Sequence, residues 1–415
     1  MTRHEVVVVG GGQAGLSVSW WLTRHGMEHV VLERSRVASS WRSERWDSFC
    51  LVTPNWQCRL PEWPYAGPDP DGFMGRDEIV AYVEGFAASF GAPVREGVEV
   101  TSVRAAAAGF DLTTTAGELS AGSVVLAVGG YHRPAVPRLA AAFDANVAQL
   151  HSAQYRSPAG LPAGEVLVVG SGQSGAQIAE DLHRAGRRVH LAVGNAPRCA
   201  RVHRGRDVVA WLEDMGHYDV PIDEHPEGLA ARREANHYVT GRDGGRDIDL
   251  RAFALEGMVL HGRLTAVERG EARFAGDLAA NLDAADATYN RINATIDAWI
   301  ERTGAAAPPP APPYEPVWRP PRTGPTSLPL ADVSAVVWCT GFRTDWSWVE
   351  VPAFDGTGYP VHHRGVTTVP GLYVIGLPWL HTWGSGRFAG IARDAEHLAA
   401  HIAARAPMAA AQVTA

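Results

Sequence analysis

The stretch EVVVVGGGQAGLSVSWWL at residues 5–22 decides the fold, and EVLVVGSGQSGAQIAEDL at residues 165–182 nearly repeats it. Each copy is a valine-rich run, then glycines spaced as G-x-G-x-x-G, then a segment that can continue as a helix. A run of this composition is typical of a strand that is buried on both faces of a parallel sheet. The repeat therefore predicts two α/β units of the same kind in one chain.

The glycines of both copies predict a turn that holds the pyrophosphate of a dinucleotide. In such a turn the first glycine makes the tight bend from strand to helix, the second lets the backbone approach the phosphates, and the third lets the helix pack closely. The phosphates then lie at the helix N-terminus, where free N–H groups and the helix dipole favour negative charge. A glycine-rich turn without a ligand is the alternative. The two sets are Gly10, Gly12 and Gly15, and Gly170, Gly172 and Gly175.

The two copies differ at the position whose side chain would contact the ribose of the nucleotide. The strand HVVLERS after the first copy carries Glu33, at the place where an acidic side chain hydrogen-bonds ribose hydroxyls, which predicts FAD. The matching strand RRVHLAVG ends at Gly194 without an acid, and Arg198, Arg201 and Arg204 follow it. Arginine binds phosphate through its planar fork, so these residues predict the 2′-phosphate of NADPH. A solvated arginine surface is the alternative.

Composition and charge exclude several classes of function. The 415-residue chain carries a net charge of −8, which argues against a nucleic-acid partner because such proteins have a basic excess. All 37 basic residues are arginines, so neither a Schiff-base lysine nor a P-loop lysine is available. The four cysteines form no C-x-x-C pair, which excludes a local redox dithiol and favours the reducing cytoplasm. No apolar run reaches transmembrane length, so we expect no membrane partner.

The order of the motifs predicts an α/β fold with two Rossmann-like dinucleotide-binding domains, the NADPH domain inserted into the FAD domain. Residues 1–158 and 326–415 are expected to form the FAD-binding domain. Residues 159–325 are expected to form the NADPH-binding domain, with a helical and proline-rich insertion at 223–325. The sequence leaves the oligomeric state open, a homodimer being one of the alternatives.

Three further segments have a predicted role in this arrangement. SVVLAVGGYHRPAVP at 123–137 and SAVVWCTGFRTDW at 334–346 each run from a strand into glycine, and we expect them to carry the chain between the domains. Apolar residues recur at spacings of 3, 4 or 7 within residues 274–303, which predicts a long amphipathic helix packed on the NADPH domain. The proline-rich stretch after this helix is predicted to be a connector.

The C-terminal stretch from residue 371 is predicted to form a strand, a loop and a helix in the FAD domain. We expect the helix to start near Gly384, Ser385 and Gly386, so that its positive end faces the electron-rich edge of a flavin. An ordinary packing helix is the alternative.

Beside the paired fingerprints, the segment QLHSAQYRSP at 149–158 resembles the second half of the F-x-G-x-x-x-H-x-x-x-Y/F signature of flavin-containing monooxygenases and related class B flavoprotein monooxygenases. Ala145 and Val147 depart from the first half of that signature. ASSWR at 38–42 is similar to the G-G-x-W-R loop of the family, and CTGF at 339–342 to its A-T-G-Y/F linker. Leu377 stands where related reductases have an acid. The resemblance covers most of the chain except residues 223–325.

The resemblance implies a reaction and a set of site residues. NADPH would reduce FAD, molecular oxygen would add at flavin C4a, and the C4a-peroxyflavin would transfer one oxygen atom to a small, partly apolar amine, thioether or ketone. Trp41 and Arg42 are expected to contact a cofactor. Asn55 is the candidate for a polar contact near C4a, with a turn-forming asparagine as the alternative. His151 is a candidate catalytic residue in the linker motif, expected to organise the domain linker rather than to abstract a proton. His381 is another candidate for the pocket, and a structural histidine is the alternative for both.

Two other functions remain open from the sequence. One is an NADPH reductase that passes electrons to a carrier, and the other is a non-catalytic flavin redox sensor. No metal site is predicted.

Overall fold

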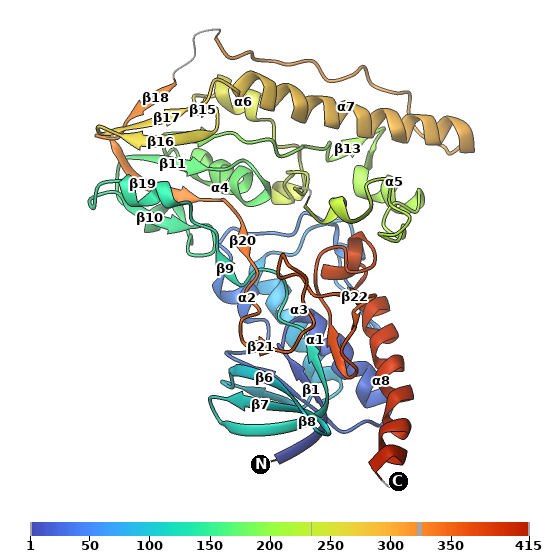
Figure 1. Cartoon of the computed structure of the whole chain (residues 1–415). Helices are drawn as coiled ribbons and strands as arrows, with labels where there is room; N and C mark the ends of the chain where they lie inside the picture. Colours follow the sequence, from blue (N-terminus) through green and yellow to red (C-terminus); the bar gives the residue numbers. More distant parts are fainter. Residues whose placement is uncertain (1, 234, 322–325, 414–415) are drawn as a thin grey trace.

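The computed structural model describes residues 2–233, 235–321 and 326–413. Two lobes are visible in Figure 1, with both ends of the chain in the lower one. We call the lobe that holds both ends the first lobe and the other the second lobe. Each lobe is built on its own sheet, so the predicted two-domain α/β fold is confirmed.

The first lobe contains a ten-stranded mixed sheet. Strands β5, β2, β1, β8 and β24 run parallel to one another, while β7 and β6 continue from β8 as antiparallel strands. The ten strands are β1 (Thr2–Val9), β2 (His29–Glu33), β5 (Val94–Glu96), β6 (Val100–Ala106), β7 (Gly109–Thr114), β8 (Gly117–Leu126), β21 (Val349–Glu350), β22 (His362–His363), β23 (Val366–Thr367) and β24 (Leu372–Val374).

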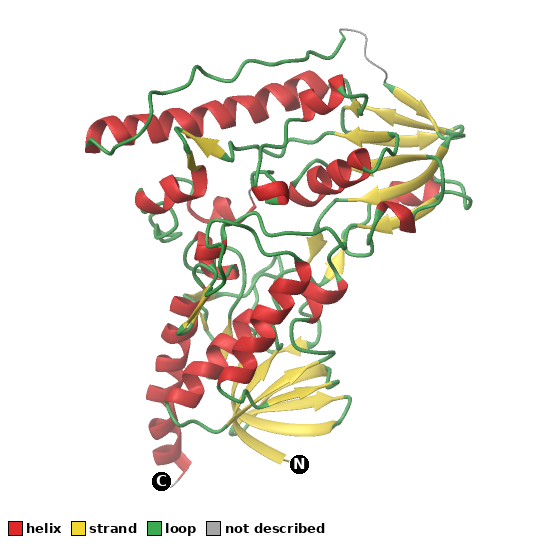
Figure 2. Ribbon diagram, turned by 180° about the vertical axis from the view of Figure 1, so that it is seen from behind, coloured by secondary structure: helices red, strands yellow, loops and turns green. Residues whose placement is uncertain are grey.

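Helices cover one face of this sheet, and Figure 2 shows them against it from behind. Helices α1 (Gln13–Arg24), α3 (Arg76–Ser89) and α8 (Ile391–Val413) bury apolar side chains in one core with Val6 and Val8 of β1. The alternate residues Val7 and Val9 pack in a second core on the other face. A valine run that is buried on both sides is therefore the centre of the lobe.

The second lobe contains a five-stranded parallel sheet in the order β10-β19-β11-β12-β15. Its strands are β10 (Ala148–His151), β11 (Glu165–Val169), β12 (Val189–Ala192), β15 (Val259–His261) and β19 (Val333–Trp338). Helix α4 (Gln173–Arg184) follows β11, as α1 follows β1.

The sheet order moves the expected boundaries between the domains. Strand β10 precedes residue 158 and β19 follows residue 326, yet both pair in the second sheet. The chain passes from the first lobe to the second at β9 (Arg133–Pro134) and returns at β20 (Phe342–Arg343). These two strands pair with each other. The segments 123–137 and 334–346 thus connect the lobes as predicted. Residue 325, where a boundary was expected, lies outside the described residues.

The predicted long helix is present as α7 (Leu278–Thr303) and ends at Gly304 in the left-handed conformation. Its side chains Leu282 and Ala285 pack in the core of the second lobe. The proline-rich stretch runs back along α7 without regular structure up to residue 321 (Figure 1). Asn290 of the helix exchanges two hydrogen bonds with the backbone of Tyr314, which ties this connector to the lobe.

The remaining elements are short. The second lobe has the helices α5 (Val208–Asp214) and α6 (Leu250–Leu255), the hairpin of β13 (Val202–His203) and β14 (Arg206–Asp207), and a small sheet of β16 (Leu264–Glu268), β17 (Glu271–Phe274) and β18 (Ser327–Pro329). The first lobe has α2 (Ser39–Ser43) and the hairpin of β3 (Arg59–Leu60) and β4 (Trp63–Pro64).

Candidate cofactor and active site

The first glycine turn joins β1 to α1. Gly10 has a φ of +112°, and a Cβ atom on Gly15 would lie 1.9 Å from the carbonyl oxygen of Gly10. Both positions therefore require glycine for the fold. A Cβ on Gly12 would meet nothing within 4 Å, and no side chain caps the N-terminus of α1. The space at Gly12 and the free N–H groups beside it fit the pyrophosphate of a dinucleotide.

The second glycine turn, between β11 and α4, repeats this geometry. Gly170 has a φ of +101°, and a Cβ on Gly175 would lie 1.8 Å from the Gly170 carbonyl oxygen. A Cβ on Gly172 would again meet nothing within 4 Å, and the N-terminus of α4 has no side-chain cap. The chain thus has one open anion cradle in each lobe.

Glu33 ends β2 beside the first turn, and its carboxylate is buried. Oε2 accepts a hydrogen bond of 2.7 Å from the Gly11 N–H, and Oε1 accepts one of 2.9 Å from the Ser35 N–H. These bonds hold the acid against the turn where the nucleotide would enter. The contact with ribose stays a prediction.

Trp41 and Arg42 lie on α2, next to the first turn. The indole Nε1 of Trp41 donates to the side-chain oxygen of Gln13, the first residue of α1, over 3.2 Å. The Trp41 ring is stacked on Phe388 with a centroid distance of 5.7 Å. Arg42 is exposed and forms an ion pair with Glu84 on α3. The loop resembling G-G-x-W-R is therefore placed at the cradle, with Trp41 nearer to it through Gln13.

The end of β12 carries no acid, as the sequence predicts. The Gly194 N–H donates to Ser171 Oγ over 3.0 Å. Arg198, however, is 2% exposed and forms an ion pair of 2.8 Å with Asp286 of α7. Its guanidinium also lies over the rings of two tyrosines, Tyr289 and Tyr314. These contacts make Arg198 part of the core between α7 and the connector.

Arg201 and Arg204 also have partners inside the protein. Arg201 donates to the backbone oxygen of Val52 in the first lobe over 2.8 Å and pairs with Asp207 over 3.3 Å. Arg204 pairs with Asp297 of α7 over 3.2 Å. The role of the three arginines toward a 2′-phosphate stays a prediction, and Arg201 in addition links the two lobes.

Ser385 and Gly386 lie in a short 3₁₀ helix, η6 (Trp383–Gly386), and not in the α-helix α8 (Ile391–Val413). The expected helix start near Gly384 is therefore wrong, because α8 begins only after the chain has doubled back. A Cβ on Gly384 would lie 2.9 Å from Gly390 Cα, so the two glycines allow this close return. The contact of Ser385 and Gly386 with a cofactor stays a prediction.

The hydroxyl of Ser385 closes this turn. Its Oγ accepts hydrogen bonds from the His381 and Thr382 N–H groups over 2.9 and 3.0 Å. The buried carboxyl of Asp394, in the first turn of α8, faces the same hydroxyl, and burial raises the pKa of this carboxyl.

Asn55 opens the 3₁₀ turn η1 (Asn55–Gln57), and its side chain is buried. The amide Nδ2 donates to the Asp69 carbonyl oxygen over 2.9 Å, and Oδ1 accepts from the Met74 N–H over 2.7 Å. Both ends of the amide therefore hold the loop 69–74. The contact with flavin C4a stays a prediction, since the structure gives this side chain backbone partners.

His151 ends β10 and contacts the second crossing between the lobes, at residues 341–342. Its Nε2 donates to the Gly341 carbonyl oxygen over 2.9 Å, and its Nδ1 accepts from the Ala153 N–H over 3.2 Å. The ring contacts Phe342 of β20 edge to face. Burial lowers the pKa of His151, so the neutral imidazole is favoured. These contacts hold His151 against residues 341–342, and its catalytic role stays a prediction.

A carboxylate that the sequence analysis missed connects both lobes. Asp181 of α4 accepts hydrogen bonds from Ser48 of the first lobe over 2.7 Å, from Tyr155 over 2.7 Å and from Arg242 over 2.8 Å. Burial and the nearby carboxylate raise the pKa of the Tyr155 phenol, so it stays a donor. The resemblance signalled Tyr155, but no pattern pointed to its acceptor.

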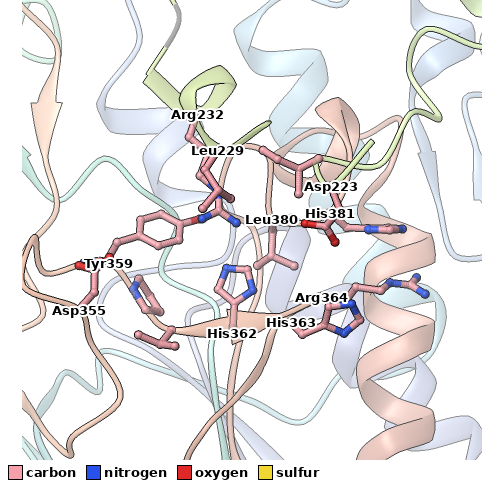
Figure 3. A pocket seen from close by; sticks show the side chains of 13 residues that line it. Asp223, Leu229, Arg232, Asp355, Tyr359, His362, His363, Arg364, Leu380 and His381 are labelled. Atoms are coloured by element: carbon pink, nitrogen blue, oxygen red, sulfur yellow. The ribbon is translucent and has the colours of Figure 1, made fainter. Parts of the chain in front are cut away.

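His381 lines a cavity of about 270 Å³ between the lobes (Figure 3). Segments far apart in the sequence form it: residues 222–232 of the second lobe, and 355–364 with 380–381 of the first. Arg232, Tyr359 and His362 point toward one another at one side of it (Figure 3). His381 thus lines a cavity, while its expected place in the flavin pocket stays a prediction, and its charged neighbours carry no motif that could have revealed them.

The four cysteines are free thiols. Burial raises the pKa of Cys50 to about 11 and those of Cys58 and Cys199 to about 12. It also raises the pKa of Cys339. The thiols are thus protonated at neutral pH, which disfavours disulfide exchange because the thiolate is the nucleophile.

Within the described residues, no helix is both long and apolar enough to cross a bilayer. In the same part of the chain, no group of three or more His, Cys, Asp or Glu residues is arranged to hold a metal ion.

Comparison with known proteins identifies the family. The model of the pyridine nucleotide-disulphide oxidoreductase family matches residues 7–215, which include both glycine turns. The chain belongs to this family. A relative from Geobacillus kaustophilus, an uncharacterized CzcO-like oxidoreductase, is 30% identical over 397 residues, covering 95% of this chain and 97% of that protein. The chain is therefore an oxidoreductase of the flavin and pyridine-nucleotide type, and the family implies binding of FAD and NAD(P)H.

Solved structures show the same two-lobed fold. A mutant form of a flavin monooxygenase from Stenotrophomonas maltophilia superimposes with a TM-score of 0.65 at 21% identity, covering 97% of this chain and 99% of that one. A bacillithiol disulfide reductase from Bacillus cereus gives 0.63 at 14% identity, covering 97% and 100%. A protein named as a flavin monooxygenase and one named as a disulfide reductase thus share this fold.

Proposed function

We propose that the chain is an NADPH-dependent FAD monooxygenase that transfers one atom of molecular oxygen to a small, partly apolar amine, thioether or ketone. The observation that carries this proposal is the pair of open cradles at Gly12 and Gly172, one in each lobe. Two dinucleotides bound there lie on lobes that the β9–β20 ribbon holds together. The cofactors supply hydride transfer and oxygen activation when bound.

The chain itself has to bind, orient and shield these groups. Glu33 and the N-termini of α1 and α4 would hold the nucleotides by hydrogen bonds and dipole. Asp181 and His151 fix the lobes relative to each other through Ser48 and Gly341. Holding the lobes in place would support shielding of the bound cofactors from water, which monooxygenation needs because water diverts the reaction to hydrogen peroxide.

Disulfide reduction is the main competing activity in this family. It needs a reactive thiol, either in the enzyme or in a partner site. All four thiols of this chain have raised pKa values from burial, and Leu377 stands where related reductases carry an acid. These features favour oxygen transfer over electron export.

The test compares NADPH consumption with the amount of oxygenated product for the FAD-loaded protein. NADPH consumption is measured with a panel of amines, thioethers and ketones, and with small disulfides, in air and under argon. We expect NADPH oxidation that needs oxygen and gives oxygenated product with at least one of the first three classes. Rapid NADPH oxidation under argon with a disulfide, without any oxygenated product in air, would favour the reductase instead.

A further inference from the structure

The two glycine turns carry a glutamine at the same position. Gln13 and Gln173 each follow the second glycine of their fingerprint and are the first residues of α1 and α4. In the first turn the amide oxygen has a partner within the protein, because Gln13 Oε1 accepts from the indole Nε1 of Trp41 over 3.2 Å. The first turn therefore shows how this side chain is satisfied when the protein itself supplies the donor.

The Gln173 amide is held at one end only. Its Nε2 donates to the Val239 carbonyl oxygen over 2.6 Å. Its Oε1 is fully buried and has no hydrogen-bond partner among the described residues. A carbonyl oxygen can only accept, so the bond to Val239 fixes the oxygen of the amide as its free end. A buried acceptor without a donor costs free energy, and a donor on a ligand would recover it.

Gln173 lies directly beside the anion cradle of the second lobe. It follows Gly172, where a Cβ atom would meet nothing within 4 Å, and no side chain caps the N-terminus of α4. The residue after this glycine is a neighbour of a pyrophosphate bound in the cradle. The free acceptor of Gln173 therefore fits a donor on one half of a bound dinucleotide.

The segment that holds the Gln173 amide runs to the first lobe. Val239 accepts the bond from Nε2, and Gly241 follows two residues later. A Cβ on Gly241 would lie 2.1 Å from the carbonyl oxygen of Leu51, a residue of the first lobe. Gln173 is thus tied to the part of the second lobe that faces the interface.

Hydride transfer decides which half of the nucleotide lies on this side. The adenosine half is expected at the end of β12, where Gly194 is the residue next to its ribose. The nicotinamide has to reach a flavin in the first lobe, so its half of the molecule has to run toward the interface. The donors of this half are the carboxamide N–H groups and the hydroxyls of the adjoining ribose.

We propose that Gln173 Oε1 accepts a hydrogen bond from the nicotinamide half of the bound nucleotide, either from the carboxamide or from the ribose next to it. Gln173 then ties this half, through the Val239 carbonyl, to the segment that contacts the first lobe. The inference rests on the nucleotide site of the proposed function, but it does not depend on which oxidation the protein catalyses.

The experiment is calorimetric titration of the FAD-loaded protein with NADP⁺ and with 2′,5′-ADP, which lacks the nicotinamide half. Gln173→Leu should weaken NADP⁺ binding about tenfold and leave 2′,5′-ADP binding within about twofold, because one hydrogen bond to the nicotinamide half is lost. Unchanged NADP⁺ affinity in the folded variant, or an equal loss for both ligands, would overturn the proposal. Wild-type protein that binds neither ligand would contradict the nucleotide site itself, and with it the proposed function.

Gln149→Leu is the matched control. Gln149 is an exposed glutamine of β10 whose Nε2 donates to the Ala140 carbonyl oxygen and whose Oε1 accepts from Trp338 Nε1. Both ends of its amide have protein partners, so this variant should leave both affinities unchanged. Gln173→Ala is a second, smaller replacement and should weaken NADP⁺ binding as Gln173→Leu does. FAD content and the thermal midpoint report whether each variant is folded.

An analogue of the nucleotide identifies the donor. In 3-acetylpyridine adenine dinucleotide phosphate a methyl ketone replaces the carboxamide, so its N–H groups are missing. If the carboxamide is the donor, the wild-type protein should bind this analogue about tenfold more weakly than NADP⁺, and Gln173→Leu should bind the two alike. If the ribose is the donor, Gln173→Leu should weaken binding of both nucleotides by the same factor.

Discussion

The two glycines that leave open space are the sharpest test of the cofactor sites. Gly12→Val adds a branched side chain where nothing lies within 4 Å, so the chain should fold while the pyrophosphate is excluded. We expect purified Gly12→Val to have lost its FAD. Gly172→Val should instead keep FAD and raise the KM for NADPH at least tenfold, about 1.4 kcal/mol. Flavin absorbance and steady-state kinetics measure both.

Gly15→Ala is the matched control for this pair. Its Cβ would lie 1.9 Å from Gly10 O, so this variant should lose stability as well as FAD. If Gly12→Val stayed fully yellow, the first turn would not be the flavin site.

Asn55 distinguishes a structural role from a contact with the flavin. Asn55→Ala removes two buried hydrogen bonds to the loop 69–74, which should lower the free energy of unfolding by about 1–3 kcal/mol. Denaturant unfolding measures this loss. If the residue also contacts the flavin, the variant should release more hydrogen peroxide per NADPH at unchanged FAD content. Unchanged stability would contradict the bonds seen here.

At the residue scale, the sequence could predict those site residues whose role depends on their neighbours along the chain. The spacing of the glycines and the place of Glu33 after a strand depend on neighbours close in the chain. The partners of Arg198 do not, because Asp286 and Tyr289 come from α7, a helix far along the chain. The position of Arg198 after a strand therefore predicted a phosphate as its partner. In the folded chain its partner is instead the Asp286 carboxylate.

At the element scale, the valine runs and the amphipathic period of α7 were enough to predict strands and helix, because burial on a sheet or along a stripe sets those periods. The start of α8 was not predictable in this way. Gly384 and Gly390 allow the chain to turn back on itself, a tertiary contact that leaves no period in the sequence.

The hydrogen bond that α4 accepts from Tyr155, within the second lobe, allows a test of an element. Tyr155→Phe removes a buried donor to the Asp181 carboxylate, and the free energy of unfolding should fall by about 1.5–3 kcal/mol. Tyr131→Phe, at an exposed tyrosine, is the control and should change little. Chemical denaturation followed by fluorescence decides between them. Equal midpoints for the two variants would show that the Tyr155 hydroxyl contributes nothing.

At the scale of the whole molecule, residues far apart in the sequence hold the lobes together, as Ser48 of the first lobe and Asp181 of α4 do through a hydrogen bond of 2.7 Å.

The order of the domains in the sequence was predictable from the two fingerprints, but the exact crossings were not. Strand β19 follows the proline-rich connector, yet it belongs to the second sheet. It lies between β10 and β11 and pairs with both. Strand pairing over such distances depends on the whole fold.

The measurement that tests the central claim most directly is isotope incorporation. The FAD-loaded protein is given NADPH, ¹⁸O₂ and each substrate that stimulates NADPH oxidation, and the product is analysed by mass spectrometry. The account predicts one ¹⁸O atom in each product molecule, one NADPH consumed for each product, and less peroxide than product. NADPH oxidation that leaves every product without ¹⁸O and passes its electrons to a disulfide or a protein carrier would contradict it.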